Sequence, residues 1–163
     1  MSLLIPPGCE PRCPGCAHRS WSAAASETQK IDWLQRILAP WADRLQALRV
    51  VTGQARWNYR RKVCLSAVWT VETGWNFGLW RRDELILIPD CPVHAESVRA
   101  MIRWLGQTLP PAPEFPLAFL VQSRAQATLI LKTHHVPDSG WLGEARRLEL
   151  AAIGLEGLWL HLH

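Results

Sequence analysis

Three cysteines, Cys9, Cys13 and Cys16, lie within eight residues near the start of the chain. Glycine and proline residues separate them, so this segment is too broken for a helix or a strand and is expected to form a loop. A fourth cysteine, Cys91, follows an apolar run and precedes a proline. A tight loop can supply three thiolates to a metal site, and a distant element can supply the fourth. The spacing therefore predicts a fold that brings Cys91 to the loop.

The clustering of the cysteines indicates metal binding rather than disulfide formation. The chain holds 5 cysteines, an odd number, and a disulfide between Cys13 and Cys16 would close a loop too small to stabilise the fold much. The first residues lack the charged-then-apolar pattern of a secretion signal, and no apolar run is long enough to span a membrane. Clustered cysteines in such a chain are typical of metal sites in a reducing compartment, so we expect a metal-binding protein of the cytoplasm.

The spacing leaves three kinds of metal site open. Cys-x3-Cys-x2-Cys with a later Cys-Pro is typical of iron–sulfur proteins and favours a [4Fe–4S] cluster. Zinc sites more often combine two Cys-x2-Cys pairs, of which the chain has one, although His18 or His94 would complete a zinc site. The three-cysteine spacing also occurs in radical S-adenosylmethionine enzymes. Against them stand Gly15, where those enzymes have an aromatic residue, and the fourth cysteine, which they do not use.

Hydrophobic periodicity predicts an α+β fold. Ser26-Glu-Thr-Gln29 matches a capping box, so a helix is expected from Ser26 to Pro40 and a short second one from there to Leu48. The later pattern predicts an antiparallel sheet of hairpins with flanking helices, beside the N-terminal Cys-rich cluster loop. The expected strands are 50–52, 59–72, 75–82, 85–88, 117–122, 127–133 and 158–162, and the expected helices are 92–109 and 138–153.

The expected organisation is a single domain with a small appendage, in a monomer. Residues 1–20 form the Cys-rich metal or Fe–S loop, and residues 21–109 form a central α+β domain with the fourth cysteine. Residues 110–116 are a Pro-rich linker. Residues 117–163 continue the central domain as a hairpin, a helix and a strand.

Basic and aromatic side chains gather at the start of the long predicted strand. Lys and Arg bind phosphates, while Trp and Tyr stack on unpaired bases, so these residue types together indicate RNA binding. A solvated strand entrance with an aromatic anchor is the alternative. The net charge of +4 permits RNA binding without requiring it. The candidate RNA-binding residues are Arg56, Trp57, Tyr59, Arg60, Arg61, Lys62, Arg81 and Arg82.

Three segments follow one another along the chain: Asn58-Tyr-Arg-Arg-Lys62 before an apolar strand, Asn76-Phe-Gly-Leu-Trp-Arg-Arg82, and Leu85-Ile-Leu-Ile-Pro-Asp-Cys91-Pro92 before a helix. In this order they resemble the central domain of RNA 5-methyluridine methyltransferases, over roughly residues 9–108. The iron–sulfur branch of that family methylates C5 of a uracil in ribosomal or transfer RNA with S-adenosylmethionine. The resemblance implies a [4Fe–4S] cluster held by Cys9, Cys13, Cys16 and Cys91, and contact with RNA.

The chain also departs from that family. Cys9 and Cys13 are closer together than the family's first two cysteines, and no oligonucleotide-binding barrel precedes them. The S-adenosylmethionine-binding catalytic domain is absent from these residues, so we do not expect them to methylate RNA alone. A separate or missing methyltransferase domain would bind that cofactor. Cys64, the remaining cysteine, lies within a predicted strand and is expected to be an inert core thiol rather than a nucleophile.

A protein of a different class is the main alternative. The chain holds 10 tryptophans, more than one small core can bury, so some are expected on an exposed surface. A stand-alone interaction module stabilised by zinc would use such a surface to bind another protein.

Overall fold

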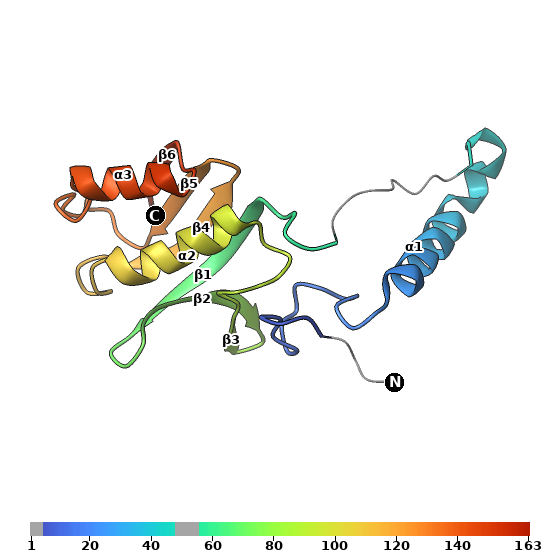
Figure 1. The fold of residues 1–163 in the computed structure, drawn as a ribbon, viewed down its shortest axis with the longest axis horizontal. Helices are drawn as coiled ribbons and strands as arrows, with labels where there is room; N and C mark the ends of the chain where they lie inside the picture. The colour runs from blue at the N-terminus through green and yellow to red at the C-terminus, as the bar shows by residue number, and fades with distance from the viewer. Residues whose placement is uncertain (1–4, 48–55) are drawn as a thin grey trace.

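The computed structural model describes residues 5–47 and 56–163. Its centre is a six-stranded sheet with the strand order β3-β2-β1-β4-β5-β6 (Figure 1). Neighbouring strands run antiparallel except β5 and β6, which are parallel. The strands are β1 (Lys62–Thr70), β2 (Gly74–Arg81), β3 (Glu84–Leu87), β4 (Leu117–Ser123), β5 (Gln126–Leu131) and β6 (Gly157–Leu162).

The helices of the described residues are α1 (Ala23–Leu38), the 3-10 helix η1 (Ala39–Arg44), α2 (Glu96–Thr108) and α3 (Glu144–Ala152). The α+β class predicted from the sequence is confirmed. The sheet is mixed rather than wholly antiparallel, because α3 carries the chain back between β5 and β6 and so makes them parallel. In the part of the chain that the structure describes, no helix is both long and apolar enough to cross a membrane.

The core lies between one face of the sheet and the helices α2 and α3. Leu105 of α2 and Leu120 of β4 are fully buried, and Leu150 of α3 is 6% exposed. Trp104 on α2 donates a hydrogen bond from Nε1 to Glu149 on α3, at 2.8 Å. Figure 1 shows both helices over the same side of the sheet. Burying apolar side chains between these two layers provides the main stabilisation of the fold.

Strand β1 sorts its side chains by alternation. Val63, Leu65 and Ala67 point into the core, with 6%, 2% and 7% of their surface exposed. Cys64 lies between them on the opposite face of the sheet and is exposed. The prediction that Cys64 is a core thiol is therefore wrong, because the two-residue period of a strand outweighs the apolar character of its neighbours.

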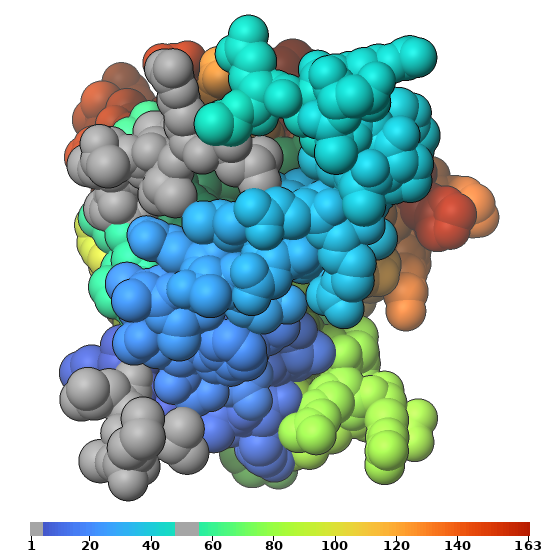
Figure 2. All heavy atoms as spheres, turned by 90° about the vertical axis from the view of Figure 1, so that its right-hand side faces the viewer, coloured from blue at the N-terminus to red at the C-terminus, as the bar shows by residue number. Residues whose placement is uncertain are grey.

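Helix α1 begins one turn earlier than predicted. Ser22 is its N-cap and accepts a hydrogen bond from the backbone N–H of Ala25 at 3.1 Å. Ser26, the predicted cap, is buried and pairs with Nδ1 of His18 at 2.8 Å. The helix extends away from the sheet (Figure 1), and Figure 2 shows it with the N-terminal loop on one side of the molecule.

The other predicted elements are present with shifted ends. The helix predicted at 92–109 begins at Glu96, because Val93 and Ala95 hydrogen-bond across to Arg60. The helix predicted at 138–153 begins at Glu144 and ends before Gly154, whose φ of 83° stops it. The strand predicted at 50–52 lies outside the described residues.

The Pro-rich segment 110–116 packs against the sheet. Phe115 is fully buried, and its backbone N–H donates to the carbonyl oxygen of Pro111 at 2.9 Å. The indole N–H of Trp75 on β2 donates to the carbonyl oxygen of Pro110 at 2.7 Å. These contacts tie the segment to the same core that α2 and β2 share.

Candidate metal centre

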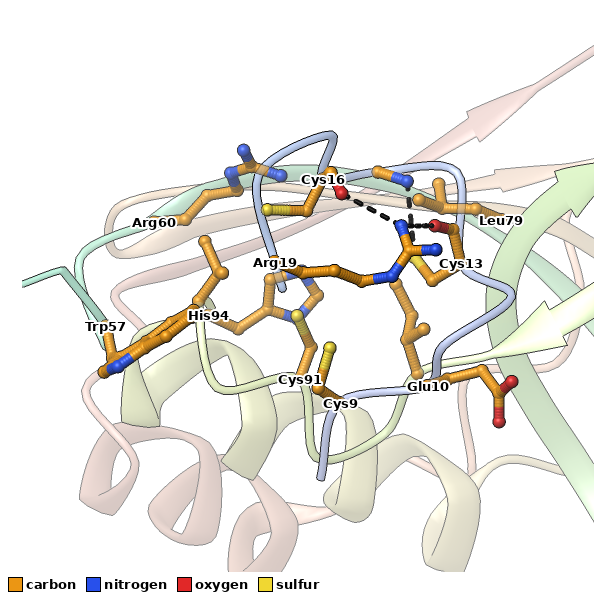
Figure 3. A pocket seen from close by; sticks show the side chains of 13 residues that line it. Cys9, Glu10, Cys13, Cys16, Arg19, Trp57, Arg60, Leu79, Cys91 and His94 are labelled. Carbon is orange, nitrogen blue, oxygen red and sulfur yellow. Dashed lines mark hydrogen bonds between the residues drawn. The ribbon is translucent and has the colours of Figure 1, made fainter. Parts of the chain in front are cut away.

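All four predicted cysteine ligands line one pocket, together with Arg19, Arg60 and His94 (Figure 3). Cys9, Cys13 and Cys16 come from the N-terminal loop, and Cys91 comes from the turn after β3. The loop and the turn are far apart in sequence but lie against each other in the fold. Figure 3 shows the sulfur atoms of Cys9 and Cys91 side by side in the pocket, with Cys16 across from them.

Local hydrogen bonds fix the turn that carries Cys91. The backbone N–H of Cys91 donates to the carbonyl oxygen of Ile88 at 3.4 Å, and the N–H of His94 donates to the carbonyl oxygen of Cys91 at 3.0 Å. Arg99 on α2 donates to the carbonyl oxygens of Cys91 and His94, at 3.5 and 3.0 Å. The turn is thus held between β3 and the first turns of α2.

Gly8 allows the N-terminal loop to approach that turn. Its φ is 77°, and a Cβ atom at this position would overlap the backbone carbonyl of Asp90, the residue before Cys91. Only glycine adopts this backbone conformation without strain and also permits so close a contact. Gly8 therefore sets the distance between the loop and the turn that carries Cys91.

Gly15 lies in close contact with its surroundings in the middle of the loop. A Cβ atom there would lie 2.9 Å from a methyl group of Leu79 on β2 and 3.4 Å from the sulfur of Cys13. The backbone N–H of Gly15 donates to that sulfur at 3.3 Å. Hydrogen bonds from backbone N–H groups to sulfur are a recurrent feature of thiolate-bound metal sites.

Arginine side chains bind carbonyl oxygens within the loop and connect the loop to the rest of the protein. Arg19 donates to the carbonyl oxygens of Cys13 and Cys16, at 3.2 and 3.0 Å (Figure 3). Arg12 forms an ion pair with Glu84 on β3 at 2.5 Å, and Arg81 on β2 donates to the carbonyl oxygen of Arg12 at 3.4 Å. The loop is thereby attached to the β2–β3 hairpin as well as to the Cys91 turn.

The thiols of the pocket influence one another. Burial raises the pKa of Cys9, the nearby thiol of Cys91 raises it further, and Cys13 and Cys16 add smaller effects. The positive charge of Arg19 acts in the opposite direction. A bound cation would offset the repulsion between thiolates gathered at one site.

The donor chemistry suits a thiolate-bound metal. Four sulfur donors match the ligand count of a zinc site built from four cysteines or of a [4Fe–4S] cluster, and Arg19 and Arg60 supply positive charge at the pocket wall. Among residues 5–47 and 56–163, no three His, Cys, Asp or Glu side chains stand close enough together to hold one metal ion as placed. Metal binding would therefore draw the thiols closer together.

His94 is a further side chain of this pocket and is almost completely buried, at 2% exposed. Burial lowers the pKa of His94 to about 4, and the positive charges of Arg60 and Arg99 contribute. Its Nδ1 atom is buried without a hydrogen-bond partner among the described residues. The sequence named His94 as a substitute zinc ligand, and the structure places it beside all four cysteines.

The candidate RNA-binding residues divide into several groups. Arg56 donates to the carbonyl oxygens of His18 and Trp21 at 3.0 and 2.5 Å and stacks on Trp57, with its guanidinium 4.9 Å from the ring centre. Arg56 therefore links the start of α1 to the residues before β1. Trp57 is partly buried and also lines the cysteine pocket (Figure 3).

Arg60 and Arg61 lie in different places although they are adjacent in sequence. Arg60 is partly buried and lines the cysteine pocket, whereas Arg61 is exposed and lines a separate hollow with Arg124. Tyr59 is 55% exposed. The remaining candidates are the exposed residues Lys62, Arg81 and Arg82.

Sequence reasoning missed the residues that position the site. Arg19 and Arg99 were not singled out, although Arg19 lies only three residues after Cys16 and that nearness was a usable signal. Gly8 and Gly15 adjoin the cysteines in sequence, but their role depends on contacts with Asp90 and Leu79. No local pattern predicts those contacts.

No protein-family model matches the chain, and no curated protein matches it significantly. The resemblance to RNA 5-methyluridine methyltransferases therefore depends on the order of motifs alone.

Proposed function

We propose that Cys9, Cys13, Cys16 and Cys91 hold a [4Fe–4S] cluster, and that the chain is the cluster-bearing, RNA-contacting part of an RNA uracil-C5 methyltransferase system. The observation that supports this most directly is the shared pocket, in which a loop with three cysteines meets a Cys-Pro turn 75 residues later (91 − 16). That arrangement agrees with the order of motifs in the sequence. A reducing compartment such as the cytoplasm suits free thiolates.

The chain's own residues prepare the pocket for such a group. Gly8 brings the loop to the Cys91 turn, Arg19 fixes the carbonyl groups of the loop, and the Gly15 N–H supports the sulfur of Cys13. A bound cluster would be attached to three cysteines of the loop and to Cys91 of the turn, and this cross-link would stabilise the fold. Methyl transfer itself would need S-adenosylmethionine and a catalytic thiol from a separate methyltransferase domain.

The exposed cations form the proposed RNA surface. Arg61 precedes β1 and Lys62 is its first residue. Tyr59, close by in the sequence, exposes more than half of its surface. Phosphate contacts from Arg and Lys provide affinity without sequence preference, and an exposed tyrosine can stack on a base. Ribosomal or transfer RNA is the expected partner.

The decisive experiment measures iron, sulfide and zinc in the protein purified without oxygen, together with its visible spectrum. We expect about four irons and four sulfides per chain, as a [4Fe–4S] cluster contains. Cys91→Ser should lower the iron content severalfold and lower the melting temperature, because it removes the ligand that joins the turn to the loop. Cys64→Ser is the matched control, since Cys64 is exposed on the sheet and is not among the residues that line the pocket.

A zinc-stabilised interaction module is the second candidate. His94 in the cysteine pocket offers a nitrogen ligand that zinc accepts readily, and exposed tryptophans at Trp33, Trp41 and Trp159 offer apolar surface. One zinc per chain, without iron or sulfide after anaerobic reconstitution, would replace the cluster proposal with this one. RNA binding would then depend on the exposed cations alone.

A further inference from the structure

The orphaned nitrogen of His94 is the least expected feature of the candidate metal centre. A buried polar atom without a hydrogen bond destabilises a fold by about 1–3 kcal/mol, and nearly all such atoms in folded proteins are paired. His94 is 2% exposed, and its Nδ1 atom has no partner in the part of the chain described by the structure. Its backbone, in contrast, is fully engaged through the N–H to Cys91 and through the carbonyl oxygen to Arg99.

The surroundings of His94 indicate what the missing partner would be. The side chain lines the pocket that contains all four cysteines (Figure 3). The other charged side chains of the pocket are Arg19, Arg60 and Glu10. The two arginines carry hydrogen-bond donors only, and the Glu10 carboxylate is paired with Arg12 at 3.1 Å. For the tautomer that carries its proton on Nδ1, sulfur is therefore the acceptor that the side chains of the pocket provide.

The number of metal ligands in the pocket decides whether His94 would bind the metal or only support the site. Four cysteines already complete the coordination of a [4Fe–4S] cluster, so a fifth protein ligand is not required. In every protonation state a histidine ring carries at least one N–H group. Hydrogen bonds to the sulfur atoms of a cluster stabilise its more negative, reduced form and raise its reduction potential.

We propose that His94 donates an imidazole N–H hydrogen bond to a sulfur atom of the bound iron–sulfur group, either a cysteine thiolate or a bridging sulfide. This inference depends on the proposed cluster. His94 is then a positioning residue of the metal centre: it retains the cluster and sets its potential without ligating iron. Its location three residues after Cys91, fixed by the hydrogen bond between the two backbones, keeps the ring in place.

The test compares His94→Phe with His94→Gln in the full chain, reconstituted with iron and sulfide without oxygen. Phenylalanine fills similar space without a donor, whereas glutamine restores an N–H donor. We expect His94→Phe to retain its iron and sulfide and to shift the reduction potential of the cluster to a more negative value. It should also lose iron to a chelator about tenfold faster, because a factor of this size corresponds to the free energy of one charge-assisted hydrogen bond. His94→Gln should recover most of both changes. His161→Phe, an exposed histidine on β6, is the control for loss of a histidine alone.

The melting temperature of the metal-free proteins provides a second measurement. In these proteins His94→Phe should change stability in the opposite direction from the loaded protein. Removing an unpaired buried nitrogen should raise the melting temperature of the metal-free His94→Phe protein, while the loaded variant should melt lower than the loaded wild type. A merely structural histidine would move both temperatures in the same direction. If His94→Phe fails to fold, the comparison of His94→Leu with His94→Gln replaces it.

The possible outcomes separate the cluster proposal from the proposed role of His94. If the wild type takes up no iron and sulfide, the cluster proposal fails and the role of His94 fails with it. If the wild type loads but His94→Phe leaves the potential and the chelation rate unchanged, only the role of His94 is overturned. If His94→Phe abolishes iron binding as Cys91→Ser does, His94 is a ligand, and the hydrogen-bond proposal is overturned.

Discussion

At the scale of single residues, glycines decide whether the cysteine loop can reach Cys91. Gly8 combines a positive φ with a contact so close that any side chain would meet the carbonyl of Asp90. Gly74 has a similar φ of 69°, but open space surrounds the position of its missing Cβ. The two glycines separate the effect of backbone conformation from the effect of contact.

Gly8→Ala should therefore destabilise the protein more than Gly74→Ala. A left-handed conformation costs a residue with a Cβ about 1–2 kcal/mol, which we expect for both variants. In Gly8→Ala the added methyl group should also push the loop away from Asp90. This displacement should destabilise the protein further and lower its iron content. Denaturant unfolding and iron analysis of both variants check this. Equal losses of stability with unchanged iron in both would show that the close contact at Gly8 has no consequence.

At the scale of elements, the first turns of α2 hold the Cys91 turn through Arg99. The side chain of Arg99 is 19% exposed, and its guanidinium group binds Glu96, Asn58 and two carbonyl oxygens. Arg103, one turn later, is 46% exposed and forms ion pairs with Glu96 and Asp90. The same helix thus carries one partly buried arginine and one that water reaches freely.

Arg99→Leu should lower the free energy of unfolding by about 2–3 kcal/mol, because partly buried carbonyl oxygens lose charged donors. Arg103→Leu should cost less than about 1 kcal/mol, since ion pairs in contact with solvent contribute little. Urea unfolding at equal salt concentration measures both. Similar values for the two variants would contradict the assignment of Arg99 as the support of the Cys91 turn.

At the scale of the whole molecule, the sheet separates the basic side chains by location. Arg60 faces the metal centre, Arg61 faces a hollow shared with Arg124, and Lys62 begins β1. Lys132 lies just beyond the opposite end of the sheet, where Leu117 pairs with Leu131. A nucleic acid bound near the metal centre would contact the first group and not Lys132.

Arg61→Ala should weaken RNA binding and reduce the slope of log affinity against log salt by about 1, as expected for one lost phosphate contact. Lys132→Ala should change neither quantity. Titration of a single-stranded RNA at several salt concentrations gives both numbers. An unchanged slope for Arg61→Ala, or an equal change for Lys132→Ala, would show that this end of the sheet is not the RNA-binding surface.

The sequence predicted the elements well where the signal is local. Turn residues and a period of two predicted the three hairpins, β1–β2, β2–β3 and β4–β5, close to their observed bounds. The same period placed Val63, Leu65 and Ala67 in the core. It also assigned Cys64 to the other face, and the prediction of a core thiol was wrong because it weighed the apolar neighbours above the alternation.

Helix starts were less predictable because caps compete. Ser22 and Ser26 are both good N-caps by residue type. The hydrogen bond from Ala25 to Ser22 and the pairing of Ser26 with His18 show that Ser22 begins α1. For α2, the backbone of Val93 and Ala95 bonds to Arg60 and delays the helix to Glu96. In both cases a contact from outside the segment decides the boundary.

The sequence by itself determined the α+β class and the hairpins, because periodicity and turns are local properties, and it marked four cysteines as one candidate site by their residue type. The tertiary structure alone decided that Gly8 packs on Asp90, that adjacent arginines face different hollows and that His94 lies in the cysteine pocket with an unpaired nitrogen. These features depend on contacts between residues far apart in the chain. Such contacts are fixed only when the sheet, its helices and the N-terminal loop pack together.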